Sequence, residues 1–108
     1  MIRSVAEALA LASSAGLSVT FRSLGDWGPA RLLAEYEPRE RTIAIDITTC
    51  ARLRERGGPE FAERFVACAI VHELFHHRFP QASERAAHVF VRATTGEDPH
   101  AFARALRA

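Results

Sequence analysis

The spacing of apolar and polar positions divides the first half of the chain into one helix and three strands. Val5, Leu9 and Ala12 recur at helical spacing, and Gly16 stands where a helix commonly ends, so we expect a helix over residues 4–15. Three later segments alternate with the two-residue period of half-buried strands, namely residues 17–24, 30–37 and 42–47. Because the turns between them are short, we expect an antiparallel meander.

The second half of the chain is predicted to be helical. The expected helices cover residues 49–56, 60–78, 83–96 and 100–106. Thr48 or Thr49 is the expected cap of the first, and Pro80 ends the second, since the residue before a proline is disfavoured in helical geometry. Residues 61–71 are apolar on every side, which is typical of a helix buried in the middle of a small domain.

The end of this buried helix contains an HExxH motif, formed by His72, Glu73 and His76. Histidines four residues apart leave a helix on the same face and can bind one zinc ion, and Glu73 then lies beside the metal as a potential base. The alternative is a structural pair of histidines. The apolar run before the motif and a carboxylate after a short turn, Glu84, favour the metal site.

With this motif and the segment 83–90, the chain resembles the gluzincin zinc metallopeptidases, which share HExxH and a glutamate on the next helix. The order of elements over residues 41–93 is similar to the ImmA/IrrE-like branch and to the compact minigluzincins. The resemblance implies an α+β, zincin-like domain whose three-stranded, mainly antiparallel sheet packs on the HExxH helix and on the following Glu helix. It further implies that strand 42–47 forms the rim of the cleft, where substrate lies in extended form by strand addition.

The resemblance also implies that Glu84 is the third zinc ligand, although the spacer of seven residues after His76 is short and His88 stands where a small polar residue is common. Position favours Glu84 over His88 as well. Glu84 lies in the first turn of its helix, nearest the metal and near the positive end of the helix dipole, whereas His88 lies about 6 Å further along.

A zinc ion with three protein ligands keeps a fourth position for water and lowers the pKa of that water to about 7. Glu73 is expected to take the proton from this water and pass it to the leaving amine. Candidates for stabilising the oxyanion are Tyr36, His77, His88 and His100. We favour His88, which shares a helix face with Glu84, although it can equally be an ordinary half-buried residue. His77 leaves its helix roughly 100° from His76 and is expected at the surface.

Composition narrows the class of protein. A chain of 108 residues is expected to form a single domain, residues 1–108, and its fourteen basic residues, all arginine, are spread along a chain of net charge +1. Nucleic acid is therefore not an expected partner. Cys50 and Cys68 stand inside predicted helices and outside any CxxC pair, which suits buried thiols in a reducing compartment. We expect a cytoplasmic protein with no signal peptide and no membrane span.

Two functions follow as hypotheses. The first is a zinc metallopeptidase that acts on a peptide or protein, with a narrow substrate range or in a latent form, for example covered by residues 98–108. The second is a catalytically silent, zincin-like module that binds a partner protein such as a repressor, because ImmA/IrrE-like proteins often act on transcriptional repressors. The presence of Glu73 favours the enzyme, since a purely structural metal site does not need that carboxylate.

Overall fold

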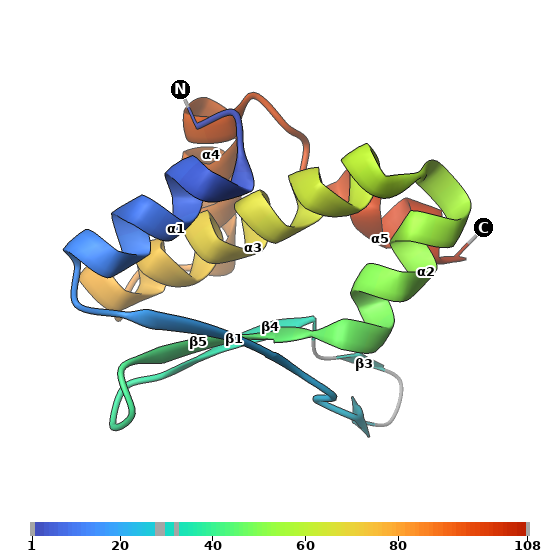
Figure 1. Ribbon diagram of the computed structural model, residues 1–108. Helices are drawn as coiled ribbons and strands as arrows, with labels where there is room; N and C mark the ends of the chain where they lie inside the picture. Colours follow the sequence, from blue (N-terminus) through green and yellow to red (C-terminus); the bar gives the residue numbers. More distant parts are fainter. Residues whose placement is uncertain (1, 28–29, 32, 108) are drawn as a thin grey trace.

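Five helices lie on one side of a three-stranded sheet in the part of the chain that the structure describes (Figure 1). The structure is a computed structural model, and it describes residues 2–27, 30–31 and 33–107. The helices are α1 (Val5–Ser14), α2 (Ile47–Gly57), α3 (Pro59–Arg78), α4 (Glu84–Thr95) and α5 (His100–Arg107). The strands are β1 (Ser18–Arg22), β2 (Asp26–Trp27), β3 (Ala30–Arg31), β4 (Ala34–Glu37) and β5 (Thr42–Asp46).

The sheet is mixed, in the order β1-β5-β4, so the predicted antiparallel meander is wrong. β4 and β5 form an antiparallel hairpin, but β1 pairs with β5 in parallel, with Val19 opposite Ile43. Ile43, Ala44 and Ile45 are at most 1% exposed, so both faces of β5 are covered, as expected of a central strand. Contrary to what the resemblance implied, β5 therefore does not form the rim of a cleft. The edge strands of this sheet are β1 and β4.

The predicted strand 30–37 is broken. Only β4 joins the main sheet, while β3 pairs with β2 in a separate two-stranded ribbon. The turn expected over residues 25–29 begins at Gly25, whose φ of 78° is left-handed, and β2 follows it directly. The rest of that predicted turn, residues 28–29, lies outside the described residues, as does residue 32.

The helix α3 is the centre of the core, which confirms the interpretation of its apolar sequence. Ile70 and Val71 are at most 1% exposed, and buried side chains of α1, β5, α2 and α4 belong to the same apolar cluster. The last helix joins this cluster through Phe102, whose ring centroid lies 5.1 Å from that of Phe61 and 5.5 Å from that of Phe65.

Side-chain caps lie at the starts of α2 and α4, as Ser4 does at the start of α1. Asp46, and not Thr48 or Thr49, caps α2: its Oδ2 accepts hydrogen bonds from the amide of Thr49 at 3.0 Å and from the hydroxyl of Thr49 at 2.6 Å. Ser83 caps α4, and Gly96 ends it with a φ of 78°, which agrees with the helix predicted over residues 83–96. The sequence pattern does not identify Asp46 as the cap of α2, because Asp46 is also the last residue of the preceding strand, β5.

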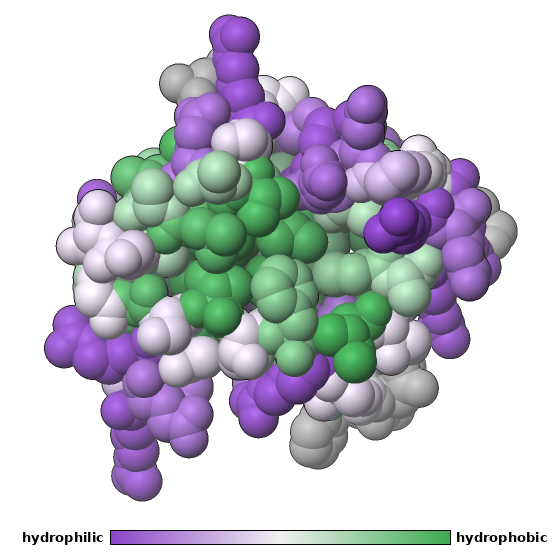
Figure 2. Space-filling model, viewed as in Figure 1, coloured by the Kyte–Doolittle hydropathy of each residue, from purple (hydrophilic) through white to green (hydrophobic). Residues whose placement is uncertain are grey.

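The face of the molecule shown in Figure 1 carries an apolar area among polar side chains. Figure 2 shows apolar side chains gathered across the middle of this face, over α1 and toward the sheet, and Leu9 of α1 is 39% exposed. Among the described residues, no helix has the length and apolar character needed to cross a membrane.

Candidate metal centre

A groove of about 850 Å³ runs along α3 between β4 and α4, and α5 also contributes to its lining. Cys68, Ala69, His72, Glu73 and His76 line it at intervals of one, three or four residues, so they form one stripe along the helix. The stripe is apolar toward the start of α3 and polar toward its end. The HExxH residues therefore lie at the polar end of a largely apolar groove.

The three predicted ligands converge in this groove. The Nε2 atoms of His72 and His76 lie 3.1 Å apart. Glu84 reaches both of them, with Oε2 at 3.1 Å from His72 Nε2 and Oε1 at 2.6 Å from His76 Nε2. The chain reverses between α3 and α4 over residues 79–83, which brings the first turn of α4 next to the end of α3. The Glu84 side chain is 67% exposed, so this side of the cluster is open to solvent.

These residues fit a zinc ion in chemistry and in size. Two imidazoles and one glutamate form a donor set found in catalytic zinc sites. Bonds of about 2.1 Å in tetrahedral geometry separate donor atoms by about 3.4 Å, so the observed separations of 2.6–3.1 Å require a small outward shift. Burial lowers the pKa of His72, which favours the neutral imidazole that binds metals.

The carboxyl group of Glu73 lies inside the groove and is suited to proton transfer. The residue is 9% exposed, and the pKa of Glu73 is raised from 4.5 to about 7, chiefly by burial; His76 opposes the rise, and Glu84 and Glu35 contribute to it. A carboxyl group with such a pKa can take up and release a proton near neutral pH. A cation bound nearby would favour its ionised form.

His88 lies next to two of the predicted ligands, His72 and Glu84. Its Nε2 is 3.9 Å from Glu84 Oε2, and its ring centroid is 5.5 Å from that of His72. One donor atom from each of His72, Glu84 and His88 lies within 4.8 Å of the other two. The structure thus contains a second group of side chains that could hold a metal ion, and it shares His72 and Glu84 with the predicted one.

His77 is half-buried, so its expected place at the surface is wrong. Its Nδ1 lies 2.6 Å from the hydroxyl of Tyr36 on β4, and the two rings meet edge to face with centroids 5.1 Å apart. β4 packs against the end of α3, and contact between these elements covers the face on which His77 lies. Tyr36 lines the groove, so it remains a candidate for stabilising the oxyanion. His77 contacts the hydroxyl group of Tyr36 through its Nδ1 atom.

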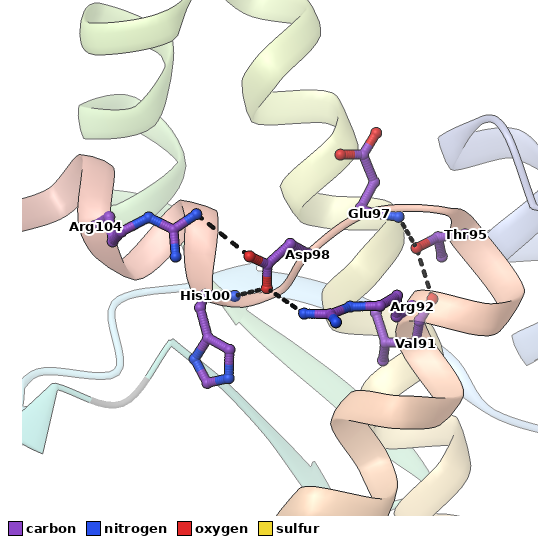
Figure 3. Close-up of polar contacts among 7 residues, drawn as sticks. All are labelled: Val91, Arg92, Thr95, Glu97, Asp98, His100 and Arg104. Atoms are coloured by element: carbon purple, nitrogen blue, oxygen red, sulfur yellow. Dashed lines mark hydrogen bonds and ion pairs between the residues drawn. The ribbon is translucent and has the colours of Figure 1, made fainter.

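His100 lies at the start of α5, which Asp98 fixes in place (Figure 3). Asp98 Oδ1 accepts hydrogen bonds from the amide of His100 at 3.0 Å and from Arg92 at 3.1 Å, and its Oδ2 accepts one from Arg104 at 3.3 Å. These contacts, that from the His100 amide first, lower the pKa of Asp98. The imidazole of His100 points away from this carboxylate, and its centroid lies 4.8 Å from that of His88.

Comparison of the chain with protein-family models, with curated proteins and with solved structures finds no match. The evidence for the function of this chain is therefore the arrangement of side chains in the groove.

Proposed function

We propose that the chain is a zinc-dependent metallopeptidase of the gluzincin type, which hydrolyses peptide bonds with Glu73 as the general base. The observation that carries this proposal is the convergence of His72, His76 and Glu84 within 3.1 Å of one another, beside a buried Glu73 and inside a groove. A structural pair of histidines explains neither the glutamate from a second helix nor the buried carboxyl group.

Each of these residues then has a defined role. His72, His76 and Glu84 would hold the zinc ion, which when bound supplies a Lewis acid and lowers the pKa of water to about 7. Glu73 accepts the proton of the attacking water and delivers it to the nitrogen of the leaving amine. The place of Glu73 in the groove, next in sequence to the proposed ligand His72, supports this role.

An extended peptide fits the groove as substrate. β4 is an edge strand, and Ala34, Glu35 and Tyr36 line the groove directly. Edge strands bind peptides by main-chain hydrogen bonds, and the side chains of the peptide then enter neighbouring pockets. We therefore assign to β4 the role that the family resemblance implied for residues 42–47.

Replacing the general base tests this function. Glu73→Gln keeps the size of the side chain but cannot accept a proton, so we expect peptide cleavage to fall at least 100-fold while the zinc content stays near one per chain. Cleavage is measured by mass spectrometry on a proteome-derived peptide library. Glu63→Gln, at an exposed position of the same helix, is the matched control and should cleave like the parent.

Two results would count against the enzyme. Equal cleavage by Glu73→Gln and the parent would rule out the general base. A parent protein that binds zinc and cleaves no peptide would favour either a latent form or the alternative, a zincin-like module that acts on a partner protein without hydrolysing it.

A further inference from the structure

We infer that His88 is a fourth metal donor, which together with His72, His76 and Glu84 completes the coordination of the metal in the resting protein. The inference rests on the proposed metal site, and it adds a form of regulation to it. His88 was predicted to stabilise the oxyanion, and the two roles lead to different experimental results.

The position of His88 on α4 carries the inference. Glu84 and His88 are four residues apart, so they leave α4 on the same face. His88 Nε2 is 3.9 Å from Glu84 Oε2, only about 0.5 Å more than the separation of two donors on one tetrahedral zinc ion. Donor atoms of His72, Glu84 and His88 all lie within 4.8 Å of one another, so His88 is near enough to join the two ligands that these groups share.

Neighbouring rings hold His88 in this position. Its ring lies edge to face against His72 at a centroid distance of 5.5 Å and against His100 at 4.8 Å. His100 is in turn held at the start of α5 by Asp98. The imidazole of His88 is thus kept beside the ligands by contacts from both α3 and α5.

A fourth protein donor changes what the site can do. Zinc sites with four protein ligands are structural, whereas catalytic sites keep one position open. A site closed by His88 is therefore inactive until the imidazole moves aside. The side chain of His88 is 31% exposed and lines the groove, so a peptide entering the groove has direct access to it. The resting protein is latent, and substrate binding displaces His88.

X-ray absorption spectroscopy at the zinc edge tests this inference, because imidazole ligands give a distinct scattering pattern and can be counted. We expect three imidazoles in the zinc-loaded parent protein and two in His88→Ala. Val89→Ala, at an exposed position of the same helix, should keep three. His88→Gln serves as a second variant if the alanine variant does not fold. Two imidazoles in the parent would overturn the inference.

Zinc affinity and cleavage give a second, independent result. Competition with a chromophoric chelator should show zinc binding weakened about tenfold or more in His88→Ala and unchanged in Val89→Ala. Peptide cleavage by zinc-saturated His88→Ala should rise above that of the parent. Unchanged affinity with reduced cleavage would instead assign His88 to the oxyanion and overturn the inference. If no variant cleaves peptides, the proposed enzyme fails, while the imidazole count still decides the role of His88.

Discussion

At the scale of single residues, the buried polar side chains are of two kinds: most form hydrogen bonds within the fold, and one faces the groove. Asp46, Thr49, Glu73 and Thr95 are the buried polar residues of the described chain. Asp46 and Thr49 bond to each other at the start of α2, and the hydroxyl of Thr95 donates to the carbonyl of Val91 within its own helix at 2.7 Å. Glu73 differs from these three because it faces the groove. A buried carboxyl group is unfavourable unless it is neutral or paired, so its position is better explained by function than by folding.

The two cysteines give a prediction that depends on pH. Burial raises the pKa of the thiols of Cys50 and Cys68 from 9.0 to about 11. Only the thiolate reacts, so at pH 8 alkylation by iodoacetamide should be about 100-fold slower than for a free thiol. The rate should rise about tenfold per pH unit up to pH 10, whereas that of an ordinary thiol levels off near pH 9. Intact-mass measurements in the folded protein follow the reaction, and levelling off below pH 9 would contradict the raised pKa.

Local spacing explains which site residues could be predicted. The approach of His72 to His76 follows from helix geometry alone, and that of Glu84 needs only a short reversal after Pro80. The bond between Tyr36 and His77 depends on where β4 packs, which no local pattern contains. Its one sequence signal is the alternation that places Tyr36 on the same face as Ala34.

At the scale of the elements, Asp46 joins three parts of the fold. It ends β5, caps α2, and accepts a hydrogen bond from the amide of Leu24 at 3.0 Å. Asp46→Ala removes the cap, which contributes about 1 kcal/mol, and takes an acceptor from a buried amide, which costs about 1–3 kcal/mol. We expect the free energy of unfolding to fall by about 3 kcal/mol in urea titrations.

Ser83→Ala is the matched control for this prediction. It also removes a side-chain cap, but at an exposed position where Ser83 accepts from the amide of Ala86 at 3.1 Å. Its expected cost is about 1 kcal/mol. Equal losses in the two variants would show that the contact of Asp46 with Leu24 contributes nothing to stability.

Strand order shows the limit of prediction at this scale. Alternating apolar residues identified the segments that became β1, β4 and β5, but alternation does not say which strands are neighbours. The available signal was the run Ile43, Ala44 and Ile45, because three successive apolar residues indicate a strand covered on both faces. On this signal, β5 is expected in the centre of the sheet and β4 at its edge.

At the scale of the whole molecule, the last helix is part of the core and not a removable cover. Phe102 is 3% exposed, and Arg56 of α2 donates hydrogen bonds to the carbonyls of Ala105 and Leu106 at 2.7 and 2.8 Å. Deleting residues 98–108 would therefore open the core together with the groove, at a cost of about 3–5 kcal/mol for Phe102 alone. Such a deletion changes the core and the groove together, so its effect on cleavage does not show whether residues 98–108 inhibit the site. A substitution at His88 leaves α5 in place and avoids this problem.

The proposed metal site connects the two helices that contribute its ligands, so zinc should stabilise the folded chain. His72 and His76 belong to α3 and Glu84 to α4, and unfolding separates them. A ligand that binds only the folded state adds about 2.7 kcal/mol at 100 times its dissociation constant. For a domain of this size, that gain corresponds to a rise in Tm of roughly 10 °C or more.

Differential scanning calorimetry with and without zinc measures this effect, and two variants assign it. Glu84→Ala removes one of the two proposed ligands on α4, so a large part of the rise in Tm should disappear. Arg85→Ala changes the next, exposed residue and should keep it. Magnesium, which prefers oxygen ligands, should leave the Tm of the parent unchanged. A full rise in Glu84→Ala would show that Glu84 is not a zinc ligand.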